Sequence, residues 1–324
     1  MSITTIPVSE ANYEEQMTTR VEPFLAERRK DGFFKSFDGN EIHYEQYITP
    51  GAPAAVVIVH GFTESAEKFR EMSYNFIMMG YTVFVIDNRG HGLSYRKHPE
   101  AFEVVTVDRF EDYVKDLHHL VTGVVKPAVG DLPLYVYAHS MGGAITVQFL
   151  QTYPGIFKKA VLSAPMIQAN SGPVPPAATK LLTGFFCAIG QADKMVFIHH
   201  GFEPDRTYES SHDTSKARFD YYQAKRLKDD KLKTASASYR WVREAMKVAK
   251  KNLDPARNAK ITIPVLLCQP EEDSSVITEK EDEFIAQIPN GRIEKFYNCR
   301  HEIYAAVDDT VLKYLQTIEA FLAE

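Results

Sequence analysis

Five short segments of the chain are almost continuously apolar, a pattern typical of strands that are buried on both faces of a parallel sheet. Between them, apolar positions recur every three or four residues, which predicts amphipathic helices at about 66–79, 107–121 and 304–322 and another after Ser140. This alternation predicts an α/β fold with a mostly parallel central sheet and helices on both faces. The predicted strands are 54–59, 81–86, 134–138, 160–163 and 264–268.

The N-terminal part has a different pattern. Residues 1–30 are polar with a helical tendency. Residues 32–37 and 42–47 flank the turn sequence Asp38-Gly39-Asn40, and the second segment alternates apolar and polar side chains. This combination predicts a β-hairpin ahead of the parallel strands.

The strand–helix alternation stops between residues 166 and 256. The segment begins with a run rich in Gly and Pro and is helical in pattern afterwards, and it is too long for a loop. We therefore predict an inserted helical cap at 166–256, between two parts of one core at 1–165 and 257–324. Residues 171–256 carry fifteen Lys or Arg against ten Asp or Glu, a net charge of +5, which leaves −11 on the rest of the chain.

Composition narrows the class of protein. With 324 residues, 44% hydrophobic and 25% charged, the chain has the composition of a globular protein rather than a disordered or fibrous one. A net charge of −6 argues against a nucleic-acid partner. Three cysteines are too few for a disulfide framework, and we see neither a signal peptide nor a membrane span, so we expect a soluble cytoplasmic protein.

The most informative motif follows the predicted strand at 134–138. Ser140 lies in a run of small residues between this strand and a helix over about 145–150, which is the context of a nucleophile elbow, G-x-S-x-G. Such a turn strains the serine backbone and needs small residues two positions away on either side. Gly142 meets this need, and Ala138 stands where the first glycine is usual. The alternative is that Ser140 merely caps an ordinary helix.

A serine nucleophile also needs hydrogen-bond donors for the oxyanion. His60-Gly61-Phe62 follows the strand at 54–59, in the loop that supplies one backbone N–H in this kind of sheet. We expect this donor to be the amide of Phe62 and the second donor to be the amide of Met141. Gly61 would allow the close backbone approach. An ordinary His-Gly turn is the alternative.

A base and an orienting acid are expected late in the chain. The strand at 264–268 is followed by Glu272 and Asp273, and we favour Asp273 as the acid, with Glu272 as its competitor. His301 follows the predicted strand at 292–297 and precedes the last helix. The order serine, acid, histidine is that of α/β-hydrolases.

Other polar residues are assigned supporting roles. His91 and His139 adjoin strand ends but precede the acid, so we expect them to support the site together with His60, Gly61 and Gly142. Residues 87–94 contain two glycines and several polar side chains, which predicts a hydrogen-bonded turn that braces the site.

Taken together, these motifs make the chain resemble an α/β-hydrolase of the monoacylglycerol lipase and bacterial lysophospholipase group. The resemblance implies serine-dependent hydrolysis of the ester of a single-chain acyl lipid, without metal or cofactor. A general carboxylesterase or thioesterase and a non-catalytic lipid- or protein-binding scaffold are the alternatives. The matching segments are 60–62, 87–94, 138–143, 272–273 with 276, and 301–303.

Two parts of the cap bear on the substrate. The apolar run 181–189 could line an acyl tunnel, contact lipid or form the core of the cap itself. Residues 225–251 carry ten basic and three acidic side chains, and the helix around Trp241 has one apolar stripe. We expect its basic remainder to be solvated, or else to meet a phosphate head group or make peripheral contact with an anionic surface at the inner face of the membrane.

Overall fold

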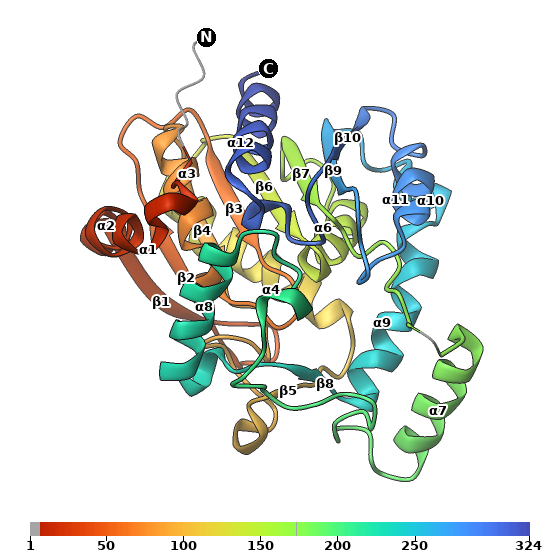
Figure 1. The fold of residues 1–324 in the computed structure, drawn as a ribbon. Coiled ribbons are helices and arrows are strands. Elements are labelled where there is room, and N and C mark those ends of the chain that lie inside the picture. Colours follow the sequence, from red (N-terminus) through yellow and green to blue (C-terminus); the bar gives the residue numbers. More distant parts are fainter. Residues whose placement is uncertain (1–6, 173) are drawn as a thin grey trace.

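The apolar runs form the centre of an eight-stranded sheet in a computed structural model that describes residues 7–172 and 174–324 (Figure 1). The β1–β2 and β2–β4 pairs are antiparallel, and the other neighbours are parallel. The sheet is therefore mixed and mostly parallel, as expected. Across the sheet the strands are β1 (Arg29–Lys35), β2 (Glu41–Tyr47), β4 (Thr82–Ile86), β3 (Ala55–Val59), β6 (Leu134–His139), β7 (Lys159–Ser163), β9 (Val265–Pro270) and β10 (Gly291–Phe296).

Helices cover both faces of the sheet because its central strands are apolar on both sides. Along β3, Val57 and Val59 belong to one buried cluster, and Val56 and Ile58 belong to another on the opposite face. The first cluster includes side chains of α4 and α6, and the second includes side chains of α3 and α12. The helices of the core are α3 (Arg70–Met78), α4 (Glu111–Leu120), α5 (Lys126–Val129), α6 (Met141–Thr152), α11 (Thr278–Ile285) and α12 (Asp308–Ala323).

The N-terminal expectations hold where the structure describes the chain. The hairpin β1–β2 is present, and residues 10–28 form consecutive helical segments. Residues 1–6, part of the stretch with predicted helical tendency, lie outside the described residues. The segments are η1 (Glu10–Asn12), α1 (Tyr13–Gln16), η2 (Met17–Val21) and α2 (Glu22–Arg28).

Helix boundaries differ from the expected ones by up to four residues. The predicted helix at 66–79 begins as the 3-10 segment η3 (Ala66–Phe69), and the last helix begins at Asp308 rather than near 304, after the 3-10 turn η8 (Ile303–Ala305). Ala306 and Val307 are extended, which separates this turn from the helix. Each helix predicted from its apolar spacing is nevertheless present.

The segment between β7 and β9 contains several helices, of which α8 lies at the left of Figure 1 and α7 and α9 lie beside each other at the lower right. It also contains a short strand, β8, which pairs with β5 of the core in a two-stranded sheet. This pairing was not expected, because each strand is only two residues long. The remaining elements are η4 (Pro99–Ala101), β5 (Val104–Val105), η5 (Val121–Val125), α7 (Pro176–Ala188), η6 (Tyr208–Ser210), α8 (Lys216–Lys228), η7 (Asp230–Leu232), β8 (Ser236–Ala237), α9 (Tyr239–Asn252) and α10 (Pro255–Asn258).

Within residues 7–172 and 174–324, every helix is too short or too polar to span a bilayer.

Candidate active site

Ser140 occupies the sharp turn that joins β6 to α6. Its backbone has φ 51° and ψ −117°, a conformation that is strained for a residue with a side chain. The Ser140 amide donates to Ser163 O at 3.0 Å, and its carbonyl accepts from the Met166 amide at 2.8 Å, so the turn is tied to the chain that follows β7. The serine side chain makes no capping hydrogen bond, which argues against the alternative that Ser140 merely caps an ordinary helix.

Gly142 is required by the close approach of α6 to β3. A Cβ atom on Gly142 would lie 2.1 Å from the carbonyl oxygen of Val59 and 2.7 Å from that of His60. At the other flanking position, Ala138 is fully buried in β6, so its methyl group is accommodated within the apolar core. The strand–turn–helix geometry expected from the sequence is present.

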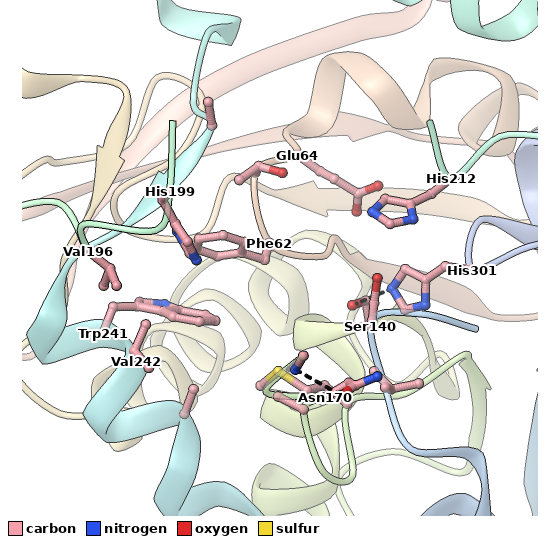
Figure 2. Close-up of a pocket in the computed structure, with 18 of the residues that line it drawn as sticks. Phe62, Glu64, Ser140, Asn170, Val196, His199, His212, Trp241, Val242 and His301 are labelled. Atoms are coloured by element: carbon pink, nitrogen blue, oxygen red, sulfur yellow. Dashed lines mark hydrogen bonds between the residues drawn. The ribbon is translucent and has the colours of Figure 1, made fainter. Parts of the chain in front are cut away.

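His301 brings the serine and the acid together from two distant parts of the chain. Its Nε2 lies 2.8 Å from Ser140 Oγ, and its Nδ1 lies 2.6 Å from Asp273 Oδ2. Figure 2 shows the His301 ring directed at the Ser140 hydroxyl. A proton on Nδ1 that donates to the carboxylate leaves Nε2 free to accept the hydroxyl proton.

Asp273, rather than Glu272, contacts the imidazole. The second oxygen of Asp273 accepts hydrogen bonds from the amides of Ser275 at 2.7 Å and Val276 at 3.0 Å, which hold the carboxylate in place. Glu272 is exposed, and among the described residues its side chain has no hydrogen bond to the histidine. The turn after β9 therefore directs one of two adjacent acids toward His301.

The charges of this pair stabilise each other. Burial lowers the pKa of His301, but the Asp273 carboxylate raises it to a net value above that of an ordinary histidine. Burial raises the pKa of Asp273, but the charge and hydrogen bond of His301 lower it below its ordinary value. The environment thus favours an ionised acid beside a histidine of increased basicity.

Two backbone amides near Ser140 are free to donate. The amides of Phe62 and Met141 have no hydrogen-bond acceptor elsewhere in the part of the chain that the structure describes. Gly61 allows the first of them to come close, because a Cβ atom on Gly61 would lie 3.1 Å from Ser140 Cβ. This arrangement is suited to stabilising negative charge on an oxygen bound at the serine.

His60 orients the peptide that carries the Phe62 amide. The Asn88 amide donates to His60 Nε2 at 2.9 Å, so the ring proton is on Nδ1, which donates to Gly61 O at 2.7 Å. Gly61 C=O and Phe62 N–H belong to one planar trans peptide and point in opposite directions. The hydrogen bond to the carbonyl therefore directs the amide away from His60.

The sequence is similar to a known protein family and to bacterial lysophospholipases. Residues 51–308 match the protein family described as serine aminopeptidase, S33. The chain belongs to this family of α/β-hydrolases. The chain is 26% identical over 284 residues to the probable lysophospholipase L2 of Haemophilus influenzae, an alignment that covers 87% of this chain and 88% of the relative. It is 27% identical over 267 residues to lysophospholipase L2 of Escherichia coli K12, with 79% and 74% covered.

Solved structures share the fold of this family member. A soluble variant of the monoglyceride lipase from Saccharomyces cerevisiae superimposes with a TM-score of 0.70 at 18% identity and covers 91% of this chain and 96% of its own. A carboxyl esterase from Bacillus coagulans gives a TM-score of 0.74 at 17% identity, with 91% and 98% covered. These structures show the same α/β-hydrolase fold, in agreement with the family match.

The histidines with expected supporting roles are buried. The His139 ring lies 4.8 Å from that of His301, and burial lowers the pKa of His139 to about 4, which keeps it neutral near pH 7. His91 packs against His60 at 5.3 Å between ring centroids. Neither ring is hydrogen-bonded to Ser140. Both rings thus pack around the site without joining the hydrogen-bonded chain.

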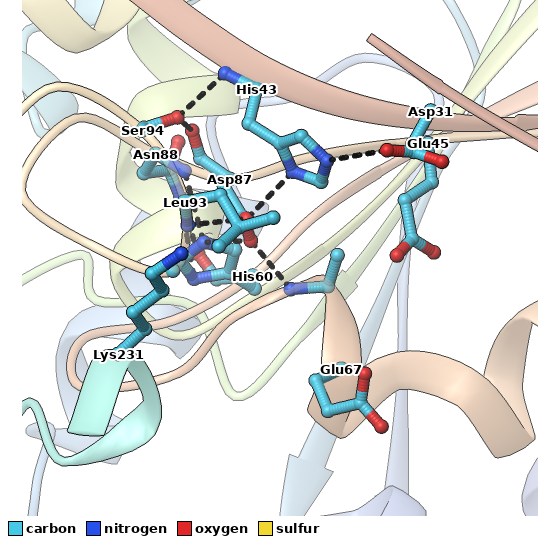
Figure 3. A network of polar contacts seen from close by, with 12 residues as sticks. Asp31, His43, Glu45, His60, Glu67, Asp87, Asn88, Leu93, Ser94 and Lys231 are labelled. Carbon is cyan, nitrogen blue, oxygen red and sulfur yellow. Dashed lines mark hydrogen bonds and ion pairs between the residues drawn. The ribbon is translucent and has the colours of Figure 1, made fainter. Parts of the chain in front are cut away.

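The turn at 87–94 braces this arrangement from the side of β4 (Figure 3). Asp87 accepts from the amides of Ala66 at 2.7 Å and Leu93 at 3.0 Å, and it contacts His43 Nδ1 at 2.8 Å. The Ser94 hydroxyl donates to Asp87 O at 2.5 Å. These bonds agree with the structural role that the sequence predicts for this segment.

A buried charged network behind the site was missed by sequence reasoning. Lys68 Nζ lies 2.6 Å from Glu302 and 3.3 Å from Glu64, and Glu64 accepts from the Gly61 amide at 2.6 Å. The Tyr304 hydroxyl also donates to Glu64. The i, i+4 spacing of Glu64 and Lys68 was a signal for part of this network, whereas Glu302 is 234 positions from Lys68.

A cavity of about 550 Å³ adjoins Ser140 and His301 between the core and the segment at 166–256. Phe62 and Trp241 pack together at 4.1 Å between ring centroids, on the side of Ser140 where Val196 and Val242 also lie (Figure 2). Nowhere in residues 7–172 and 174–324 are three or more His, Cys, Asp or Glu grouped so as to hold a metal ion.

The apolar run at 181–189 is largely exposed and does not form a buried core of its own. Leu182 and Thr183 line the cavity, whereas Leu181 is 75% exposed and Phe185 is 56% exposed. The stripe of α9, with Trp241 and Ala245 buried, packs toward the core instead.

Proposed function

We propose that this protein hydrolyses the carboxylic ester of single-chain acyl lipids, of the lysophospholipid or monoacylglycerol type. The observation that carries the proposal is the hydrogen-bonded chain from Ser140 through His301 to Asp273 at the wall of a partly apolar cavity. In this proposal Ser140 is the nucleophile, His301 the general base and Asp273 the orienting acid.

The proposed reaction proceeds through an acyl-enzyme. His301 Nε2 takes the hydroxyl proton as Ser140 Oγ attacks the ester carbonyl, and Asp273 stabilises the resulting imidazolium. The amides of Phe62 and Met141 donate to the oxyanion, each worth about 3 kcal/mol in such sites. His301 then protonates the leaving alcohol, and water attacks the acyl-enzyme by the same route. Each step uses only protein groups, substrate and water.

The acyl chain is proposed to occupy the side of the cavity beside Trp241. Val196, Val242 and Leu182 line this region together with Phe62, and such apolar walls suit a hydrocarbon chain. The relatives named as lysophospholipases and monoglyceride lipases support an acyl lipid over a small ester. Residues 166–256 would be the cap, and 1–165 and 257–324 the two parts of the core.

The test is covalent labelling by a fluorophosphonate, with Ser140→Ala as the variant. We expect labelling and ester hydrolysis by the wild-type protein, and loss of both in the variant with the fold retained, as judged by circular dichroism. Labelling that survives the substitution would place the nucleophile elsewhere. An unlabelled wild-type protein would favour a non-catalytic binding scaffold.

Relative activities on a matched substrate panel separate the remaining alternatives. Lysophospholipids and monoacylglycerols should be hydrolysed with higher kcat/KM than short-chain nitrophenyl esters or thioesters. The reverse order would indicate a general carboxylesterase or thioesterase. Aminoacyl amides should be included among the substrates, because the matching family is that of serine aminopeptidases.

Contact with an anionic lipid surface is proposed for α7 and α9 rather than for α9 alone. Three of the five basic side chains of α9 pair with acids, as Arg240 does with Asp193 at 2.6 Å, and only Arg243 and Lys250 have no such partner among the described residues. The neighbouring α7 exposes Leu181 and Phe185. An exposed apolar helix beside unpaired cations suits the interface of an anionic membrane.

A further inference from the structure

Arg226, on α8, is a buried cation with no carboxylate within 4.0 Å among the described residues. It is one of four buried arginines among residues 7–172 and 174–324, and its exposed fraction is 9%. Buried charges are normally paired, because removing them from water is unfavourable. The other three follow this rule, as shown by Arg70 with Glu45 at 2.9 Å, Arg89 with Asp116 at 2.5 Å, and Arg218 with Glu71 at 3.0 Å.

The guanidinium of Arg226 is fixed in position and faces the cavity. Its Nε donates to Leu232 O at 3.1 Å, its Nη2 donates to Thr234 O at 3.1 Å, and its Cζ lies 4.6 Å from the ring centroid of Phe202. Its Nη1 donates to no other residue that the structure describes, and no described carboxylate lies within 4.0 Å of the side chain. Arg226 lines the same cavity as Ser140.

A second arginine, Arg206, lines the cavity nearby. It is half-buried, its Nη2 donates to Ser210 O at 3.0 Å, and it too has no described carboxylate within 4.0 Å. Burial lowers the pKa of Arg226 and the charge of Arg206 lowers it further, whereas Tyr222, Glu302 and Asp213 raise it, and the net pKa lies below the ordinary value. His212, whose ring lies 5.8 Å from that of His301, lines the same cavity.

The acidic residues around the cavity do not neutralise these arginines. Glu302 is paired with Lys68 at 2.6 Å, and Glu64 is bound by the Gly61 amide and also lies near Lys68. Burial and the neighbouring charge of Glu302 raise the pKa of Asp213 well above its ordinary value, which favours its neutral form. Neither arginine therefore has a carboxylate within 4.0 Å in the part of the chain that the structure describes.

We propose that Arg226 and Arg206 form a subsite for the phosphoryl head group of the substrate, which makes a lysophospholipid the preferred ester. This inference rests on the proposed ester hydrolysis. It adds the residues that would select a lysophospholipid over a monoacylglycerol. Guanidinium groups match the geometry of phosphate oxygens and bind them with charge-assisted hydrogen bonds. A bound phosphoryl group supplies the missing counter-charge, whereas the neutral glycerol of a monoacylglycerol does not.

The test compares kcat/KM for lysophosphatidylglycerol and for a monoacylglycerol with the same acyl chain. In Arg226→Gln and Arg206→Gln, the ratio of the two values should fall about tenfold to a hundredfold, mainly through KM for the phospholipid. Lys228→Gln removes an exposed charge from the same helix and should keep the wild-type ratio. Ratios within about twofold of wild type in both arginine variants would overturn the proposal.

A binding measurement separates this inference from the proposed reaction. Titration calorimetry with glycerol 3-phosphate should show binding to the wild-type protein and weaker binding to both arginine variants. Arg206→Gln guards against misfolding, because it removes only one hydrogen bond. Equal binding of glycerol 3-phosphate to all three proteins would contradict the subsite. The subsite would also be contradicted if inorganic phosphate binding depended on the arginines while the kcat/KM ratio of the two substrates stayed unchanged. A wild-type protein that binds glycerol 3-phosphate but hydrolyses neither ester would refute the proposed function.

Discussion

Asp273 Oδ2 lies 2.6 Å from His301 Nδ1, although the two residues follow different strands of the sheet. The amides of Ser275 and Val276 hold the other carboxylate oxygen, so the acid cannot turn away from the ring without losing three hydrogen bonds. This geometry fixes the proton of His301 on Nδ1 and presents Nε2 to the Ser140 hydroxyl.

Asp273→Asn should lower kcat/KM for ester hydrolysis by about a thousandfold to ten-thousandfold, because the amide no longer stabilises the imidazolium or its tautomer. In the wild-type protein, activity should fall as the pH decreases through a His301 pKa that lies above the ordinary value. Removing the carboxylate should move this acid limb to lower pH. The measurement is the pH profile of kcat/KM for both proteins, taken in buffers of constant ionic strength.

Glu272→Gln is the matched control for this prediction. Glu272 is adjacent in sequence, carries the same charge and is exposed, so its substitution should leave the pH profile close to wild type. A larger loss of activity for Glu272→Gln than for Asp273→Asn would reverse the assignment of the acid.

His60→Ala should lower kcat roughly tenfold to a hundredfold, because Gly61 O loses the hydrogen bond from His60 Nδ1 that orients the peptide carrying the Phe62 amide. Since His60 acts through this peptide, KM should change little. Steady-state kinetics and the rate of fluorophosphonate labelling both report this effect.

Phe62→Ala provides the contrast, because it keeps the amide and removes only the ring that packs on Trp241. It should affect KM more than kcat. A kcat in His60→Ala equal to wild type would show that the hydrogen bond to Gly61 O is dispensable for orientation.

The fold and much of the site geometry could be predicted from the sequence because their signals are local. The central strands are buried on both faces and are therefore apolar without interruption, and the turn at Ser140 needs small neighbours such as Gly142. The sequence alone does not decide whether Glu272 or Asp273 is the acid that contacts His301. This choice depends on the hydrogen bonds of the turn at 273–276, which no pattern of residue types encodes.

Other features could not be predicted because they join distant segments. The basic remainder of α9 was expected to be solvated or to meet an anionic group, but Lys251 pairs with Glu111 of α4. The apolar pattern at 181–189 left three roles open, and the choice depends on the packing of its helix beside α9, which leaves Leu181 exposed. In each case the sequence shows the composition of one segment, whereas the residues that this segment contacts depend on the tertiary structure.

Gly142→Ala should destabilise the protein by about 3 kcal/mol or more, because its methyl group would overlap backbone atoms of β3 that have no room to move. Gly184→Ala is the matched control in α7, where a Cβ meets nothing within 4 Å. It should stabilise the protein by about 0.5 to 1 kcal/mol. Urea unfolding measures both, and a wild-type midpoint for Gly142→Ala would contradict the close contact.

Asp87→Asn should lower the free energy of unfolding by about 2 to 3 kcal/mol at pH 7, because two amides and His43 bind the charged carboxylate. Burial raises the pKa of Asp87, but the His43 hydrogen bond and charge outweigh it and leave the pKa below its ordinary value. A carboxyl with a lowered pKa stabilises the fold above its unfolded pKa of about 3.9 and loses this effect as the pH falls further.

The difference in unfolding free energy between wild type and Asp87→Asn should therefore narrow below about pH 4. Asp31→Asn is the control, because Asp31 is half-exposed and lies 3.9 Å from the other nitrogen of His43. It should change the unfolding free energy by less than about 1 kcal/mol. A difference for Asp87→Asn that is constant from pH 7 to pH 3 would show that its charge is not the stabilising feature.

Phe185→Ser should weaken binding to anionic phospholipid vesicles roughly tenfold, because α7 would lose one large apolar side chain from the proposed contact. Phe33→Ser is the matched control: Phe33 is 52% exposed on β1, away from α7. Arg243→Gln should reduce binding about fivefold at low salt, since each basic group near such a surface contributes about 1 kcal/mol. Vesicle sedimentation measures all three, and binding that ignores both salt and anionic lipid content would exclude the basic contribution.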